Sequence, residues 1–79
     1  MKGKQMIVPH ERLGGVYFEG DLELWTTLRC ADELKYQSTF KKQVADKAMR
    51  RAGLLPYVRL PGRSGLNLWI AEEVVKLKG

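Results

Sequence analysis

Cysteine and histidine are almost absent from this chain, which contains one of each, Cys30 and His10. A single cysteine cannot form an internal disulfide, which argues against a small secreted scaffold held together by disulfides. One Cys and one His cannot complete a structural zinc site, and the sequence predicts no metal and no cofactor. Cys30 lies in a short amphipathic stretch and is expected to be a small buried apolar residue rather than a nucleophile.

Long apolar runs are also missing, and none approaches the roughly 20 residues that a membrane-spanning helix needs. Residues 1–5 open with charge but have no apolar segment behind them, so they do not read as a signal peptide. We therefore expect a cytoplasmic protein with no membrane partner.

No catalytic constellation is visible. The acids are scattered, no serine or cysteine has a base beside it, and no glycine-rich loop matches a phosphate cradle. With 79 residues the chain is one domain at most, and such a domain buries only about 60% of its unfolded surface. A deep catalytic cleft is not expected, and we predict that the protein is not an enzyme.

Positive charge is what the sequence has in excess. Lys and Arg number 14 against 9 Asp and Glu, giving a net charge of +5 and favouring a polyanionic partner such as nucleic acid. Between Lys35 and Arg63 there are eight cations and a single acid, Asp46, so the local surplus of +7 exceeds that of the whole chain.

Residues 1–21 differ from the rest. Two short β-prone runs, 6–8 and 16–18, are separated by Pro9 and by Gly14 and Gly15. This segment is predicted to be either a hairpin or a loosely held N-terminal arm, and the sequence does not decide between them.

Residues 22–79 read as a second unit. Residues 22–25 alternate as in a strand, and Thr26 and Thr27 can cap a helix that begins near Leu28. Leu28, Ala31 and Leu34 would face a core. Ser38 is a suitable N-cap for a longer helix over residues 39–52, which Gly53 would stop. Two helices joined by three or four residues are typical of a helix-turn-helix.

The remaining residues predict a β-hairpin and a last helix. Residues 54–60 and 66–70 read as strands, residues 61–65 as the turn, and residues 71–78 as a short helix. Glu72 and Glu73 at its start, with Lys76 and Lys78 at its end, complement the helix dipole. The order predicts an α+β fold, a small winged helix in which residues 56–69 are the wing.

The second helix would have two unlike sides. The apolar side carries Phe40, Val44, Ala45, Ala48 and Ala52. The polar side carries Thr39, Lys42, Gln43, Asp46, Lys47 and Arg50. Gln can bind adenine in the major groove, and Arg or Lys can bind guanine. An ordinary solvated helix face is the alternative interpretation.

The hairpin adds further candidates. Arg59, Arg63 and Ser64 suit contacts to phosphates or insertion into a minor groove, although an ordinary turn with a surface Arg would look the same. The Tyr57 hydroxyl could contact a phosphate. Trp25 and Trp69 are expected in the core rather than as stacking platforms for bases, because so small a domain needs large side chains to fill it.

Four segments carry a resemblance to known families: CADEL at 30–34, AMRRAGLLPYVRL at 48–60, GR at 62–63 and WIAEEV at 69–74. They resemble the excisionase and MerR-like winged-helix families. The ELW at 23–25 followed by CA at 30–31 also looks like the DNA-binding domains of the phage Mu repressor and transposase. The resemblance covers residues 22–78, and similar domains occur in excisionases, phage regulators and small terminase subunits.

The resemblance implies a recognition helix in the major groove and a wing on the backbone or minor groove. The predicted DNA-binding residues are Ser38, Thr39, Lys42, Gln43, Lys47, Arg50, Arg59, Arg63 and Ser64. The second helix expected here is longer than the usual recognition helix of these families.

We therefore predict a protein that binds double-stranded DNA with sequence preference. The resemblance points to a regulator of transcription or site-specific recombination in a phage or mobile element, with a recombinase or a transcription protein as a further partner. One alternative is an adaptor or inhibitor that binds proteins through a winged-helix scaffold, which a large exposed apolar patch around Tyr17 and Phe18 would favour. Another is the N-terminal domain of a longer recombinase.

Overall fold

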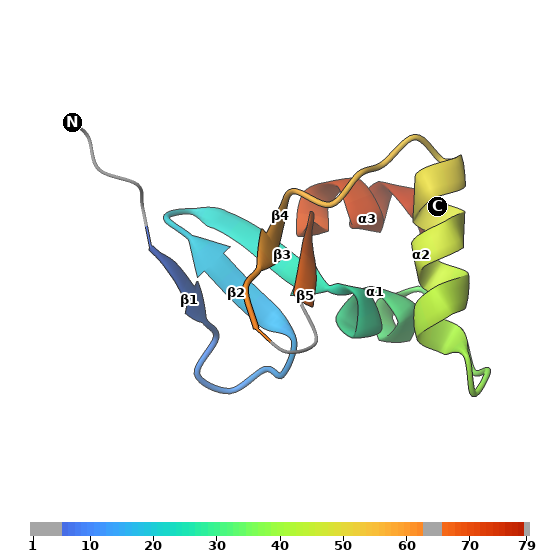
Figure 1. Ribbon diagram of the computed structural model, residues 1–79, viewed down its shortest axis with the longest axis horizontal. Coiled ribbons are helices and arrows are strands. Elements are labelled where there is room, and N and C mark those ends of the chain that lie inside the picture. The colour runs from blue at the N-terminus through green and yellow to red at the C-terminus, as the bar shows by residue number, and fades with distance from the viewer. Residues whose placement is uncertain (1–5, 63–65, 79) are drawn as a thin grey trace.

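The computed structural model describes residues 6–62 and 66–78, and the chain has an α+β fold (Figure 1). In chain order the elements are β1 (Ile7–Pro9), β2 (Val16–Glu19), β3 (Leu22–Thr26), α1 (Thr27–Glu33), α2 (Lys41–Arg51), β4 (Val58–Leu60), β5 (Leu66–Ile70) and α3 (Ala71–Leu77). The three helices lie together, away from β1 (Figure 1).

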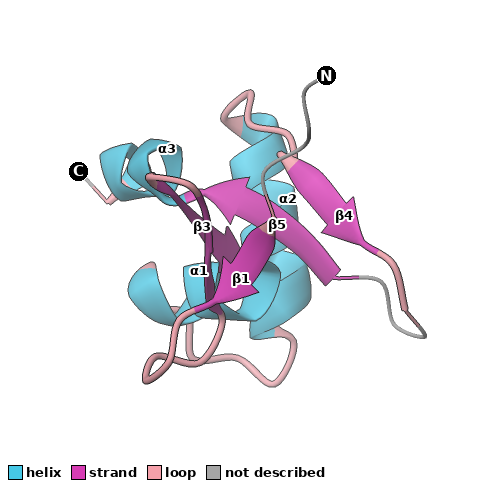
Figure 2. Cartoon of the chain, turned by 90° about the vertical axis from the view of Figure 1, so that its left-hand side faces the viewer, coloured by secondary structure: helices cyan, strands magenta, loops and turns pink. Residues whose placement is uncertain are grey.

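The strands form one antiparallel sheet in the order β1-β2-β3-β5-β4. β1 and β2 pair as a hairpin, with Val8 opposite Phe18, and β2 continues the sheet onto β3. The β3–β5 pairing places Trp25 opposite Trp69 and joins segments that are more than forty residues apart in sequence. β4 and β5 lie side by side, with β4 at one edge of the sheet (Figure 2).

The sheet is curled rather than flat. The Tyr57 hydroxyl, just before β4, donates a hydrogen bond to the Glu19 carboxylate at the end of β2, although two other strands separate β2 from β4. This bond raises the pKa of the Tyr57 hydroxyl, because the neutral form is the donor to a carboxylate. Leu24 and Leu68 are fully buried and, by strand alternation, lie on the opposite side of the sheet from Trp25 and Trp69.

The other side of the sheet packs on the helices. The buried residues of this core are Val16, Trp25, Cys30, Ala31, Ala45, Met49, Trp69, Ala71 and Val74. The prediction that both tryptophans fill the core is confirmed. Burial raises the pKa of the Cys30 thiol to about 12, so the thiol stays protonated at neutral pH, which agrees with a packing role.

The prediction for the start of α1 is correct in one respect and wrong in another. The Thr26 hydroxyl accepts a hydrogen bond from the Arg29 backbone N–H (3.1 Å), which confirms the predicted cap. The Thr27 hydroxyl accepts from Trp69 Nε1 (2.9 Å), so Thr27 takes an inward position. Leu28, predicted to face the core, is 48% exposed. Successive residues of a helix point about 100° apart, so Leu28 points away from the core when its neighbour Thr27 points toward it.

The predicted start of the second helix is also wrong. α2 begins at Lys41 rather than Thr39, and its N-cap is Phe40 rather than Ser38. The Ser38 carbonyl accepts from the Lys41 N–H and its hydroxyl accepts from the Phe40 N–H, so residues 38–41 form a tight turn instead of a first helical turn. At the other end Gly53, with a φ of 91°, follows the C-cap residue Ala52 and confirms the predicted stop.

The apolar side of α2 differs from the one predicted. Phe40 precedes the helix and is 63% exposed, and Val44 and Ala52 are exposed too. The buried residues of the helix are Ala45 and Met49, one turn apart. The face that reaches the core is therefore narrower than the sequence pattern indicates.

The hairpin and the last helix lie close to their predicted positions. β5 has the predicted bounds, but β4 starts at Val58 rather than at Leu54. The Leu54 N–H is used in closing the end of α2, by donating to the Met49 carbonyl, and Pro56 has no N–H to offer a neighbouring strand. α3 carries Glu72 and Glu73 in its first turn and Lys76 in its last, as predicted.

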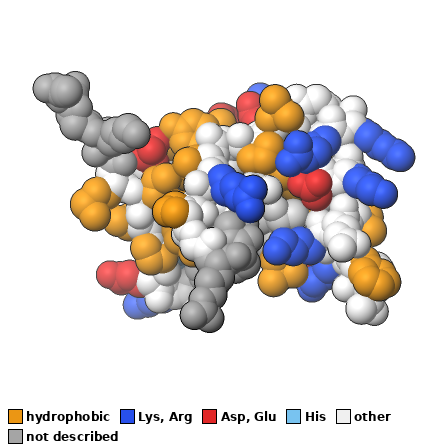
Figure 3. Space-filling model, viewed as in Figure 1, with side chains coloured by type: hydrophobic (Ala, Val, Ile, Leu, Met, Phe, Trp, Pro, Cys, Tyr) orange, Lys and Arg blue, Asp and Glu red, His pale blue; other side chains and the backbone are white. Residues whose placement is uncertain are grey.

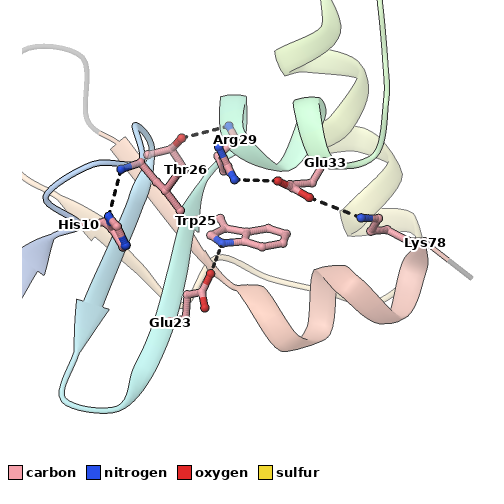
Figure 4. A network of polar contacts seen from close by, with 8 residues as sticks. His10, Glu23, Trp25, Thr26, Arg29, Glu33 and Lys78 are labelled. Carbon is pink, nitrogen blue, oxygen red and sulfur yellow. Dashed lines mark hydrogen bonds and ion pairs between the residues drawn. The ribbon is translucent and has the colours of Figure 1, made fainter.

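Polar contacts tie α1 to its surroundings (Figure 4). Glu33 accepts from Arg29 at 2.8 Å within α1, and from Lys78 at 3.4 Å at the end of α3. Trp25 Nε1 donates to the Glu23 carboxylate at 2.7 Å. Glu33 thus joins α1 to the end of α3, whereas the bond between Trp25 and Glu23 lies within β3.

A close approach at Gly15 gives a stability prediction. Gly15 has a φ of 80°, and a Cβ there would lie 2.9 Å from both Arg29 Cβ and Thr26 Oγ1. Gly53 has a φ of 91° but has open space around it, so it is a matched control. Because both substitutions strain the backbone and only one creates a clash, we expect Gly53→Ala to cost about 1–2 kcal/mol and Gly15→Ala about 2–5 kcal/mol. Denaturant unfolding measures both; equal losses would show that the contact at Gly15 is unimportant.

Candidate nucleic-acid interface

The polar side of α2 faces the β4–β5 hairpin across a hollow of about 530 Å³. We call it the basic hollow, and it is lined by Thr27, Lys42, Gln43, Asp46, Lys47, Arg50, Arg59 and Asn67. Four of these side chains are cationic and one is a carboxylate. Lys and Arg side chains gather over this part of the molecule, whereas hydrophobic side chains are more common over the strands at the other end (Figure 3).

Helical spacing and strand alternation together build the hollow. The five lining residues of α2 lie at relative positions 1, 2, 5, 6 and 9, which fall on one helical face. Across from them, Arg59 of β4 is opposite Asn67 of β5. Asn67 is two residues before Trp69, so both side chains point to the helix side of the sheet. The hollow is thus an extension of the helix–sheet interface beyond the apolar core.

Arg50 is held in place within the hollow. Its Nε lies 3.2 Å and 3.1 Å from the two carboxylate oxygens of Asp46, one turn earlier in α2. Its guanidinium carbon lies 5.8 Å from the centre of the Trp69 ring, within the range of a cation–π contact. The Trp69 ring is itself fixed by its hydrogen bond to Thr27. A chain of contacts therefore runs from α1 through β5 to the exposed side of α2.

The other cations of the hollow are not neutralised in this way. Among residues 6–62 and 66–78, no ion pair involves Lys42, Lys47 or Arg59. Lys41, which lies outside the hollow, is paired with Asp32. The hollow therefore presents three exposed cations whose charge is available to an anionic ligand.

The structure brings together five of the nine predicted DNA-binding residues, namely Lys42, Gln43, Lys47, Arg50 and Arg59. Ser38 and Thr39 do not line the hollow, since they belong to the turn that precedes α2, and Ser38 lines a separate depression with Asp32 and Lys41. Arg63 and Ser64, the predicted tip of the wing, lie outside the described residues.

Three lining residues, Thr27, Asp46 and Asn67, are not among the predicted DNA-binding residues, although the sequence places Asp46 on the polar side of the second helix. Asn67 is the one polar residue in the strand 66–70, and its position directly opposite a strand arginine could have drawn attention to it. For Thr27 the sequence indicates only a helix cap. No sequence signal connects it to residues on α2, because the connection is made by Trp69, forty-two residues later.

Other features named from the sequence have ordinary structural roles. Tyr57, considered as a phosphate contact, donates its hydroxyl to Glu19 instead. Tyr17 and Phe18 are half-buried, and Phe18 packs against the core, so they do not form a large exposed apolar patch. Within the described part of the chain, no group of three or more His, Cys, Asp or Glu side chains is placed to hold a metal ion.

Comparisons with known proteins found no matching family model, no matching curated protein and no matching solved structure. Of the helices in the described ranges the longest is α2, with 11 residues, and none is long and apolar enough to cross a membrane.

Proposed function

We propose that this chain is a winged-helix protein that binds double-stranded DNA without catalysing a reaction on it. In this proposal α2 enters the major groove, and the β4–β5 hairpin is the wing that lies on the sugar-phosphate backbone. The observation that carries the proposal is the basic hollow. On one concave surface it joins an amide-bearing Gln43, a positioned arginine and three cations that form no ion pair with another described residue.

The chemistry of the hollow is suited to a duplex. Lys42, Lys47 and Arg59 flank a region in which Gln43 and Arg50 are exposed, so phosphates and base edges could be contacted at the same time. Cations position a protein on the backbone, whereas Gln and Arg carry the donors and acceptors that distinguish bases. The element order from β3 to α3 is also the one expected of a helix-turn-helix followed by a wing.

The biological role follows by family resemblance alone. We propose a regulator of transcription or of site-specific recombination in a phage or mobile element, acting with a recombinase or a transcription protein. An exposed apolar patch at Tyr17 and Phe18 would have supported the alternative of a protein-binding adaptor, but both side chains are half-buried.

Salt dependence of binding tests the proposal. Three cations that each neutralise a phosphate should give a slope of about −3 in a plot of log affinity against log salt concentration, because every contact releases counterions. A labelled random-sequence duplex is titrated with the protein at several salt concentrations by fluorescence anisotropy. A flat slope, or no binding at low salt, would reject the DNA-binding proposal and favour a protein partner.

A further inference from the structure

Arg50 differs from the other cations of the basic hollow in having its orientation restrained on two sides. Asp46 holds Nε through both carboxylate oxygens, and the buried Trp69 ring lies beneath the guanidinium group. Its side chain is nevertheless 46% exposed. The group is therefore oriented before any ligand arrives, while its outer edge remains open to solvent.

The restraint leaves a particular set of donors free. Asp46 engages only Nε, and among the described residues neither terminal nitrogen, Nη1 or Nη2, has a hydrogen-bond partner. Guanine presents two acceptors, O6 and N7, on its major-groove edge, and an arginine fork meets both at once. A fork that is already oriented loses less conformational freedom when it binds.

We infer that Arg50 selects a G·C base pair in the major groove and that Asp46 is its positioning residue. This inference rests on the proposed function and goes beyond it by naming the base pair and the residue that sets the preference. Asp46 contributes in a second way, because a carboxylate within the hollow weakens the general attraction for phosphates. The site thus gives up some non-specific affinity and gains discrimination between sequences.

The other cations have no such arrangement. Lys42 and Lys47 are point charges on flexible stems, and Arg59 has no carboxylate partner among the described residues. They are suited to phosphates. Arg50 could itself bind a phosphate in a bidentate manner, so the experiment must separate these two ligands.

The experiment compares variants on one selected duplex and on copies in which each G·C pair is replaced in turn. Asp46→Asn removes the charge and keeps the shape, and Arg50→Lys keeps the charge and removes the fork. Asp21→Asn, in the turn between β2 and β3, makes the same charge change at a residue that does not line the hollow. Thermal unfolding is recorded for each variant, so that a loss of fold is recognised.

For the unmodified chain we expect one G·C pair whose replacement weakens binding by about 5- to 150-fold, the range for a good bidentate contact. Arg50→Lys should abolish that preference. Asp46→Asn should reduce it several-fold and, at the same time, strengthen binding to a random duplex. Asp21→Asn should leave the preference unchanged. If Asp46 had a merely structural role, Asp46→Asn would not weaken binding to the selected duplex while strengthening binding to a random duplex.

Two results would overturn the inference while leaving DNA binding intact. One is full retention of the G·C preference in Asp46→Asn, and the other is an equal loss on every duplex in Arg50→Lys, as expected of a phosphate contact. Failure of the unmodified chain to bind any duplex at low salt would instead reject the proposed function itself, so the two failures are distinguishable.

Discussion

Replacing Trp69 by alanine is expected to remove about 3–5 kcal/mol from the free energy of unfolding. Trp69 is 1% exposed, lies opposite Trp25 in the sheet and contacts the helices of the core. The substitution also leaves the buried Thr27 hydroxyl without its donor, which adds about 1 kcal/mol. Because the total free energy of unfolding of a domain of this size is only about 4–12 kcal/mol, we expect the variant to be partly unfolded at 37 °C.

Chemical denaturation followed by far-UV circular dichroism measures this loss. Leu55→Ala is a suitable control, since Leu55 is 69% exposed and its truncation should change stability by no more than about 0.5 kcal/mol. Trp69→Phe should lower the free energy of unfolding by less than Trp69→Ala and by more than Leu55→Ala, because it keeps an aromatic ring in the core but loses the hydrogen bond to Thr27. A cost below about 1 kcal/mol for Trp69→Ala would contradict the central position of this residue.

Removing three cations of the basic hollow, Lys42, Lys47 and Arg59, should produce the largest effect on binding. We expect the triple variant Lys42→Gln, Lys47→Gln and Arg59→Gln to bind duplex DNA about 10²- to 10³-fold more weakly near 0.1 M salt, because each lost phosphate contact removes about 0.9 from the log–log slope. The loss should be similar on all sequences, since phosphate contacts carry no base information. Anisotropy titrations at several salt concentrations measure both the affinity and the slope.

A second triple variant controls for total charge. Arg12→Gln, Lys35→Gln and Lys76→Gln change three exposed cations that lie outside the hollow and make no ion pair with another described residue. Both variants lower the net charge from +5 to +2. If the two triple variants lost affinity equally, the attraction would be a property of the whole chain, and the hollow would not be the binding surface.

Local signals in the sequence predict most of the elements. The alternation of residues 22–25, the Thr26 cap and the Gly53 stop all act within a few residues, and each appears in the structure as expected. The prediction is wrong where a residue can form another local hydrogen-bonded structure instead of the predicted one. Ser38 resembles an N-cap, but its hydroxyl and carbonyl close a turn onto Phe40 and Lys41, and the helix begins two residues later than predicted.

The candidate site also has one part that the sequence predicts and another part that it does not. The helical period is a property of the chain itself, so the side of α2 that carries Lys42, Gln43, Lys47 and Arg50 can be recognised from residue spacing alone. What the period cannot reveal is the surface on the other side of the hollow. Arg59 and Asn67 reach it only because β4 pairs with β5, and β5 with β3, in a sheet whose curl depends on contacts distant in sequence.

The sequence by itself determined the excess of positive charge, its concentration between residues 35 and 63, and the periodic placement of apolar residues, since these depend on composition and spacing alone. The Asp46–Arg50 ion pair is also local, since the two residues lie one turn apart in α2. Only the tertiary structure decided that the ring of Trp69 lies beside Arg50, and that Lys42, Lys47 and Arg59 have no carboxylate partner among the described residues. The physical reason is that ion pairing and ring contacts act over a few ångströms, and the separation of side chains on different elements is set by the packing of strands and helices distant in sequence.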